Sequence, residues 1–263
     1  MLLYLTALPL WLSFLLLVIV PTGIAMAGPI VVRRFIKLDR LRTNNEVAGF
    51  KFATVGVLYA VLLAFAIVVV WEKFNDAENN VAREASAVAT VFRLSEGLSP
   101  ERRAAVRAAM TLYLKTAISK DWAAMERGTG DPEVTRALTD VYTTVLNARA
   151  GDRSNEFLLT EILRQLDEVS SARRSILVSA DGNVPGILWF VLIGGAIVTV
   201  SYTFFFGTPN LHAQSVMTGA LSALVFSGLL TAIVIDHPFA GPVKVEPEAL
   251  VHVFEDFAGA PGR

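Results

Sequence analysis

The sequence predicts an all-α polytopic membrane protein with four transmembrane helices and a helical-bundle extramembrane insert between the second and the third. Four uncharged, mostly apolar stretches of about twenty residues each can cross ~30 Å of hydrocarbon; they lie at 2–20, 52–70, 187–206 and 216–235. A charged segment, 72–181, separates the two pairs. The composition agrees, because 54% hydrophobic residues and a mean hydropathy of +0.53 exceed what soluble domains carry.

The first apolar stretch is longer than a bilayer requires. It continues past Pro21 and Pro29 to Val32 and would measure ~46 Å as one straight helix. We expect a kink at Pro21 or an interfacial segment before Arg33, and a tilted straight helix is the alternative. The chain then divides into a first transmembrane pair with a basic loop (1–71), a helical extramembrane domain (72–183), a second transmembrane pair (184–237) and a C-terminal tail (238–263).

The loop between the first two spans is basic. It carries Arg33, Arg34, Lys37, Arg40, Arg42 and Lys51 against Asp39 and Glu46, whereas residues 1–32 have no charged side chain. Because positively charged short loops stay in the cytoplasm, this loop should be cytoplasmic. The insert and both termini are then predicted to be non-cytoplasmic.

Small residues recur at every fourth position inside three spans. The ridges are Gly56, Ala60 and Ala64; Gly195, Thr199 and Thr203; and Gly219, Ala223, Ser227 and Thr231. Such ridges let helices approach closely. They indicate either tight packing within one subunit or a hydroxyl-bearing face along a water-filled path. No ionisable residue lies deep in any span, which weighs against an ion-coupled transporter.

The insert has the pattern of helices throughout. Apolar residues at Val81, Ala85, Val88 and Phe92 alternate spacings of four and three, so the second span should continue as one rod until Gly97. Ser99-Pro100 and Asp131-Pro132 are helix-start signals, the second for a helix to about Arg149. A further helix is predicted over 154–179, ended by the turn residues 181–183.

Residues that could carry chemistry are scarce. The chain has no cysteine, and His212, His237 and His252 lack metal-site spacing. The carboxylates Glu84, Glu161, Asp167 and Glu168 alternate with arginines at helical spacing and are best explained as a solvated face. A net charge of -1 gives no positive surface for nucleic acid. We therefore expect no enzymatic activity, cofactor, metal or nucleic-acid partner.

Asp236 lies at a position where a negative charge is unfavourable. Asp236 follows an apolar helix whose C-terminal end carries partial negative charge, so it should have a partner. The candidates at the same predicted outer boundary are His237, Lys73, Arg173 and Arg174. The alternative is an ordinary aspartate before the turn that Pro238 initiates.

Several segments resemble the bestrophin-like domain family of mainly bacterial membrane proteins, over nearly the whole chain. They are Val57-Leu58-Tyr59-Ala60-Val61-Leu62-Leu63-Ala64-Phe65 running into Trp71-Glu72, Glu84-Ala85, Asp121-Trp122, Arg173 and Arg174, Val184-Pro185 with Trp189, and Asp236-His237-Pro238-Phe239-Ala240-Gly241. The chain departs from the family pattern at His237, where members tend to have Arg, and at Asp121, where they tend to have Glu.

The resemblance implies a function, because the family is named for similarity to bestrophins, which are oligomeric anion channels. It implies a homo-oligomeric, multi-pass channel of the bacterial inner membrane, in contact with lipid and with anions. The pore-lining candidates on the second span are Tyr59, Leu62 and Phe65, and the ion-entrance candidates are Arg33, Arg34 and Lys37. The alternative is a membrane-anchored interaction or sensor protein of the cell envelope without conductance.

Overall fold

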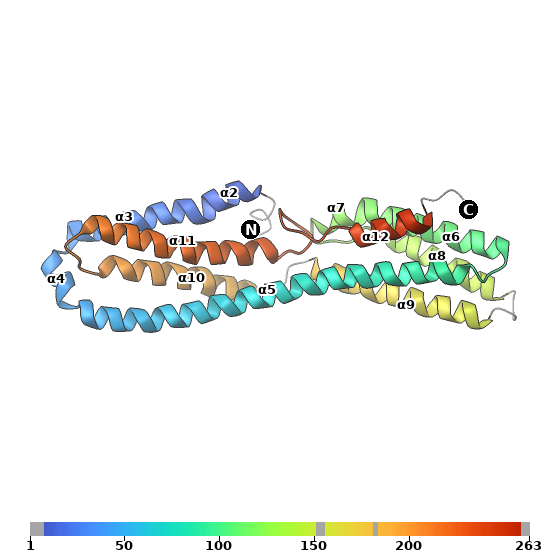
Figure 1. Cartoon of the computed structure of the whole chain (residues 1–263), viewed down its shortest axis with the longest axis horizontal. Coiled ribbons are helices and arrows are strands. Elements are labelled where there is room, and N and C mark those ends of the chain that lie inside the picture. Colours follow the sequence, from blue (N-terminus) through green and yellow to red (C-terminus); the bar gives the residue numbers. More distant parts are fainter. Residues whose placement is uncertain (1–7, 151–155, 181–183, 259–263) are drawn as a thin grey trace. The chain divides into compact units, whose positions relative to one another are not determined.

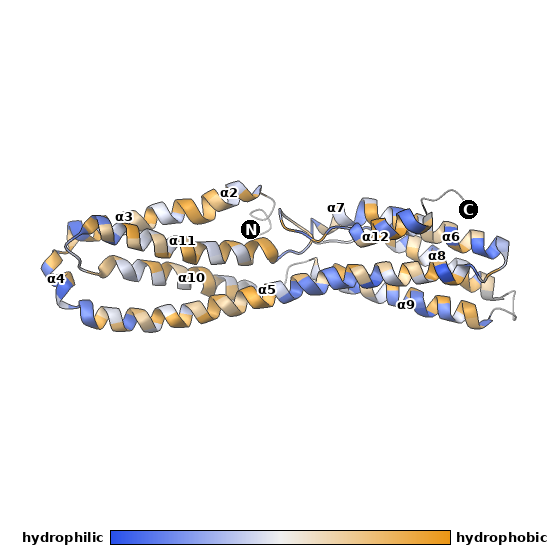
Figure 2. Cartoon of the chain, in the orientation of Figure 1, coloured by the Kyte–Doolittle hydropathy of each residue, from blue (hydrophilic) through white to orange (hydrophobic). Residues whose placement is uncertain are grey.

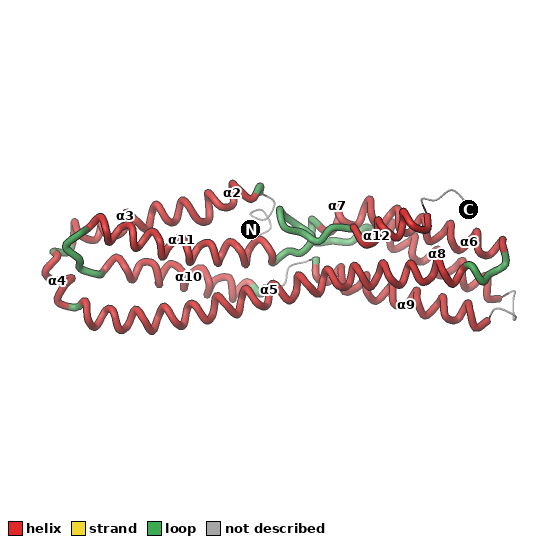
Figure 3. Tube along the Cα trace, viewed as in Figure 1, coloured by secondary structure: helices red, strands yellow, loops and turns green. Residues whose placement is uncertain are grey.

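The structure is a computed structural model, and it describes residues 8–150, 156–180 and 184–258. All regular elements within these ranges are helices, so the all-α class is confirmed there (Figure 1, Figure 3). The chain forms two compact units. Unit 1 comprises Met1–Glu72, Asn183–Asp236 and Gly241–Val243, and unit 2 comprises Lys73–Gly182, His237–Ala240 and Lys244–Arg263.

The first candidate span of unit 1 is an uninterrupted helical run, Leu10–Phe35. It consists of α2 (Leu10–Phe14), a π-helical segment η1 (Leu15–Ile19) and α3 (Val20–Phe35). The helical run continues past residue 20 to Phe35, without a separate interfacial segment before Arg33. A proline removes the hydrogen bond to the carbonyl four residues earlier, and the π-helical segment directly before Pro21 accommodates that loss. Residues 2–7 of the predicted span lie outside the described ranges.

Three more helices of unit 1 are long and apolar enough to cross a membrane, which confirms four candidate spans among the described residues. They are α5 (Asn45–Ser95), α10 (Gly186–Tyr202) extended by the 3-10 turn η3 (Thr203–Phe205), and α11 (Leu211–Ile235). The short α4 (Leu38–Thr43) precedes α5. The helix α5 continues without a break to Ser95, as the heptad-like spacing predicts, and Figure 2 shows its change from apolar to polar residues along the rod.

Close helix contacts define the interior of unit 1. A buried cluster joins Tyr59 of α5 to Trp189 and Ala196 of α10 and to Leu229 of α11. The helices α3 and α11 come close together at Gly219, where an added Cβ would lie 2.7 Å from Met26 Cγ. Gly219 therefore lies at a contact between these two helices.

Unit 2 is built from the second part of α5 and the helices α6 (Pro100–Thr116), η2 (Ala117–Asp121), α7 (Trp122–Met125), α8 (Pro132–Ala150), α9 (Glu156–Ser179), α12 (Glu248–Val253) and η4 (Phe254–Ala258). The helices α6 and α8 begin at the two prolines that the sequence marks, since a proline at the first helical position loses no hydrogen bond. Asp131 Oδ1 accepts a hydrogen bond from Glu133 N at 2.7 Å. Residues 154 and 181–183, on which two predicted boundaries depend, lie outside the described ranges.

The core of unit 2 contains a large cluster of buried apolar residues. It includes Phe92 of α5, Met110 of α6, Val141 of α8, Leu166 of α9 and Leu250 of α12. These helices bury their apolar stripes against one another, because each stripe repeats at the helical period. The residues after the last span thus contribute to this core through Leu250, which is fully buried.

Candidate functional site

The apolar part of α5 has two different faces. Tyr59 is only 5% exposed and packs with its ring against Gly195, where an added Cβ would lie 2.7 Å from Tyr59 Cδ2. Leu62 and Phe65 are far more exposed, with 48% and 67% of their surface accessible. Of the three pore-lining candidates, only Leu62 and Phe65 thus lie on an open face. Tyr59 belongs to the interior of unit 1, because it lies at a helical position that faces α10.

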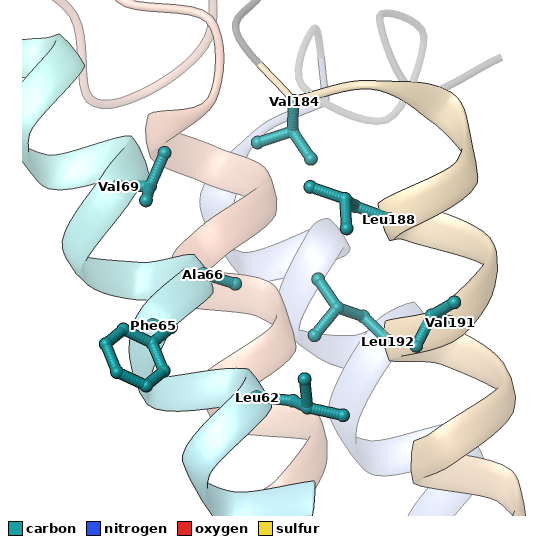
Figure 4. Close-up of a pocket in the computed structure, with 8 residues that line it drawn as sticks. All are labelled: Leu62, Phe65, Ala66, Val69, Val184, Leu188, Val191 and Leu192. Atoms are coloured by element: carbon teal, nitrogen blue, oxygen red, sulfur yellow. The ribbon is translucent and has the colours of Figure 1, made fainter.

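A groove between α5 and α10 has an entirely apolar lining (Figure 4). Its volume is about 160 Å³, and the lining residues are Leu62, Phe65, Ala66, Val69, Val184, Leu188, Val191 and Leu192. Figure 4 shows Leu62 turned towards α10, whereas the ring of Phe65 projects from the other side of α5. The groove offers no polar group that could hold an ion or a polar ligand.

The small-residue ridge of α5 also lies on an open face. Ala60 and Ala64 are exposed, and a Cβ added to Gly56 would meet nothing within 4 Å. Packing within the subunit is therefore the wrong explanation for this ridge, although it holds for Gly219. Ala223 of the fourth-span ridge packs against a small buried cluster, and Ser227 is partly buried and accepts a hydrogen bond from Thr231 Oγ1 at 3.0 Å.

The predicted entrance residues differ in their surroundings. Arg33 donates to Gln214 Oε1 at 2.9 Å and also to the carbonyl of Thr208, so it ties α3 to the start of α11. Arg34 and Lys37 are exposed. Two of the three entrance candidates are thus open to solvent at this end of unit 1, while Arg33 holds the connection between α10 and α11.

Polar residues that the sequence analysis did not single out complete this connection. Asn45 Nδ2 donates to the carbonyl of Gly207 at 2.7 Å, and Gly207 N donates back to Asn45 Oδ1 at 2.8 Å. Gln214 Nε2 donates to the carbonyl of Phe206 at 2.6 Å. A glutamine two residues before the fourth apolar stretch was the available signal, because a buried amide requires partners.

Unit 2 contains a buried acid that the sequence analysis placed on a solvated face. Glu84 is 2% exposed, and its carboxylate accepts a hydrogen bond from Tyr113 Oη at 2.5 Å. The prediction was wrong because Glu84 follows Val81 by three residues and precedes Val88 by four, which places it on the buried stripe of α5. Burial raises the pKa of Glu84 to about 7, although Tyr113 and the positive charge of Arg173 oppose this shift.

A buried ion pair lies in the same unit. Arg173 forms a salt bridge with Asp121, and both side chains are almost completely buried. Asp121 Oδ1 also accepts a hydrogen bond from Asp131 N at 3.0 Å, at the start of α8. The pair thereby joins η2, α8 and α9, and removing one member would leave a buried charge without its counter-ion.

The outer-boundary candidates lie in different surroundings. Asp236 Oδ1 accepts a hydrogen bond from Val184 N at 3.1 Å. Arg173 pairs with Asp121, and Lys73 lies 3.6 Å from an oxygen of Asp76. Arg174 is exposed, and His237 is buried. In the described part of the chain, no group of three or more histidine, aspartate or glutamate side chains could hold a metal ion.

Known structures share this fold. A bacterial Bestrophin homolog from Klebsiella pneumoniae is 15% identical, with 93% of this chain and 99% of that chain covered and a TM-score of 0.72. A single-substitution form of it is 14% identical, with 92% and 99% covered and a TM-score of 0.73. A structure described as that of a membrane protein is 16% identical, with 93% and 99% covered and a TM-score of 0.73.

Sequence comparison gives the family directly. No protein with a curated description matches the chain. Residues 19–250 match the family described as Bestrophin-like domain, and this match includes all the candidate residues on α5 and α11 as well as the buried groups of unit 2. The chain therefore belongs to the bestrophin-like domain family.

Proposed function

We propose that the protein is a homo-oligomeric channel of the bacterial inner membrane that conducts anions. The observation that carries the proposal is the open face of α5. Only 11% of the apolar window of this helix is buried within the structure, against 56% for α11. A pore-lining helix needs such a face, because the residues along a pore cannot be packed inside their own subunit. The similarity to a bacterial Bestrophin homolog supports the proposal.

Phe65 or Leu62 is the proposed constriction. Both are large, apolar and exposed, and they lie about one turn apart along α5. A ring of such side chains around a common axis would gate ions by excluding water. Tyr59 is no longer a pore candidate, since it packs against Gly195 within unit 1.

Arg34 and Lys37 are the proposed anion-attracting residues. They are exposed at the end of unit 1 that also carries Arg42 and Lys51, so the local charge there is positive. A positive entrance raises the local concentration of anions. We assign this end to the cytoplasm by the excess of Lys and Arg. Unit 2 is then an extramembrane helical domain on the non-cytoplasmic side of the membrane, and both termini lie on that side as well.

Ion flux through liposomes that contain the purified chain tests the proposal. We expect chloride flux above that of protein-free vesicles, and we expect Phe65→Ala to raise it severalfold by removing the apolar barrier. The matched control is Phe190→Ala on α10, because Phe190 is also an exposed phenylalanine of a candidate span, at 75% exposure. Its flux should equal that of the wild type.

Two results would contradict the proposal in different ways. Vesicles that hold folded protein and show no flux of chloride or potassium would instead favour the envelope anchor or sensor. Flux that is equal in the wild type, Phe65→Ala and Phe190→Ala would establish a channel but remove Phe65 as its constriction. Potassium flux larger than chloride flux would overturn the anion assignment.

A further inference from the structure

Paired hydroxyl groups line the contact between α10 and α11. Thr203 Oγ1 and Thr218 Oγ1 lie 3.3 Å apart near the connection between these helices. Thr199 precedes Thr203 by four residues, and Ser222 follows Thr218 by four. Because the two helices are joined by a short connection and run antiparallel (Figure 1), Thr199 and Ser222 occupy the same level, one turn further from the connection.

The hydroxyls at this level are buried without partners. Thr199 is 3% exposed and Ser222 is 0% exposed, and neither Oγ atom has a hydrogen-bond partner among the described residues. Thr22 Oγ1 on α3 is also buried and has no hydrogen-bond partner among the described residues. Thr22 also reaches α11 here, since its Cγ2 would lie 3.7 Å from a Cβ added to Gly219. Three helices of unit 1 thus each carry a buried hydroxyl group without a partner.

Some other hydroxyls on the candidate spans are satisfied by their own helix, although Ser215 Oγ and Tyr59 Oη are also buried without a partner. Thr231 Oγ1 donates to the carbonyl of Ser227 at 3.0 Å, and Thr54 Oγ1 donates to that of Phe50 at 3.3 Å. Bilayer lipid supplies no hydrogen bonds, so orphaned hydroxyls in a span destabilise the fold unless something pairs with them. A buried water molecule typically makes about three hydrogen bonds to such groups.

We infer that Thr22, Thr199 and Ser222 form a binding site for a buried water molecule inside the four-helix unit. Water fits because it can donate to one hydroxyl and accept from another. The site is separate from the open face of α5, since Ser222 and Thr199 are enclosed within the subunit. It is an addition to the proposed channel function and does not depend on it.

A chain of polar contacts leads from this site to the basic end of unit 1. After the Thr203 and Thr218 pair, Gln214 Nε2 lies 3.4 Å from the carbonyl of Thr203. Gln214 in turn accepts from Arg33 at 2.9 Å. These direct contacts join the level of Thr203 and Thr218 to the basic end of unit 1.

Double-mutant thermal unfolding of the purified full chain in detergent tests the shared water. We expect Thr199→Val and Ser222→Ala each to lower the melting temperature, and the double variant to lower it by less than the sum, because either single change already breaks the bridge. The control is Thr231→Val, whose hydroxyl is exposed and bonded to its own helix. Single variants that are neutral or stabilising, with additive effects, would mean a dry site and overturn the inference.

Silver-ion accessibility separates a water site from a direct contact between the two hydroxyls. The chain has no native cysteine, so Ser222→Cys introduces the only thiol. Ag⁺ is added to the folded protein, and the protein is then denatured and treated with maleimide. We expect Ag⁺ to bind this thiol first and so to prevent its labelling. Ala232→Cys, equally buried on α11 at 1% exposure, should remain free. The alternative outcome is that the melting temperatures of Thr199→Val and Ser222→Ala are coupled while Ag⁺ does not reach the thiol of Ser222→Cys. This result would indicate a direct contact between the two hydroxyls and would reject the water site.

Discussion

At the scale of single residues, the buried polar groups of unit 2 distinguish it from an ordinary apolar helical core. Glu84, Tyr113, Asp121 and Arg173 come from four different elements, and all four are almost completely buried. The Asp121 and Arg173 charges compensate each other. Glu84 accepts a hydrogen bond from Tyr113 but has no salt bridge among the described contacts. The desolvation cost of its negative charge is therefore less compensated than that of Asp121 or Arg173.

The raised pKa of Glu84 predicts how stability depends on pH. Its pKa is about 7 in the folded protein against 4.5 for an unperturbed glutamate, so the folded state binds the proton more tightly. The associated stability is fully present below pH 4.5 and is lost as the pH rises through about 7. The shift corresponds to at most about 3 kcal/mol in the free energy of unfolding.

Glu84→Gln should remove this dependence, because the amide keeps an acceptor for Tyr113 and cannot ionise. We expect the variant to melt at a higher temperature than the wild type at pH 8 and at a similar temperature at pH 4.5. The control is Glu161→Gln, since Arg164 and Gln165 hold the pKa of Glu161 down at about 2 by hydrogen bonds at the surface. A wild-type pH profile retained in Glu84→Gln would exclude Glu84 as the titrating group.

At the scale of elements, glycine decides how closely the spans pack. A Cβ at Gly195 would lie 2.7 Å from Tyr59 Cδ2, whereas one at the neighbouring Gly194 would meet nothing within 4 Å. Adjacent residues of a helix point about 100° apart, so one glycine faces α5 and the other does not. The sequence contains both glycines, and only their positions relative to α5 distinguish them.

The two glycines should therefore respond in opposite directions to the same substitution. Gly195→Ala forces the Tyr59 ring to move and should destabilise the protein by about 1–3 kcal/mol. Gly194→Ala should be neutral or stabilising by up to about 1 kcal/mol, because alanine restricts the unfolded chain and favours a helix. Thermal unfolding in detergent measures both. Equal melting temperatures for the two variants would contradict the close contact between α5 and α10.

At the scale of the whole molecule, the open ridge of α5 has the properties of a contact between subunits. Gly56, Ala60 and Ala64 leave a shallow surface on a span that is otherwise apolar. Small residues at this spacing let a second helix approach closely. If the channel assembles through α5, filling this surface should affect the assembly and leave the fold of the subunit unchanged.

Combined Ala60→Leu and Ala64→Leu substitutions should therefore lower the oligomer mass. We expect helix content by circular dichroism to match the wild type, while native mass spectrometry shows a shift to smaller species. The control is Ala220→Leu on α11, an exposed alanine of another span outside the ridge. An unchanged oligomer in the double variant would exclude this ridge as the subunit contact.

Much of the architecture follows from the sequence. The four apolar stretches predict the candidate spans, because only a helix satisfies every backbone group within a segment of that length. Pro100 and Pro132 predict where α6 and α8 begin, and the spacing of Val81, Val88 and Phe92 predicts that α5 continues as one rod to Ser95. The spans and the helix starts depend on residues that are close together in the sequence, so the sequence alone is enough to predict them.

Tertiary structure alone decided which faces are buried and which polar groups meet. The alternation of carboxylates and arginines could not separate Glu84 from Glu161, because the difference lies in which helices pack over each residue. For the same reason it could not separate Tyr59 from Phe65, or pair Arg173 with Asp121 across 52 residues of chain. The sequence determined an all-helical chain with four candidate membrane spans. Packing between distant helices determined its buried acid and its open α5 face, because burial is a property of contacts that no local pattern encodes.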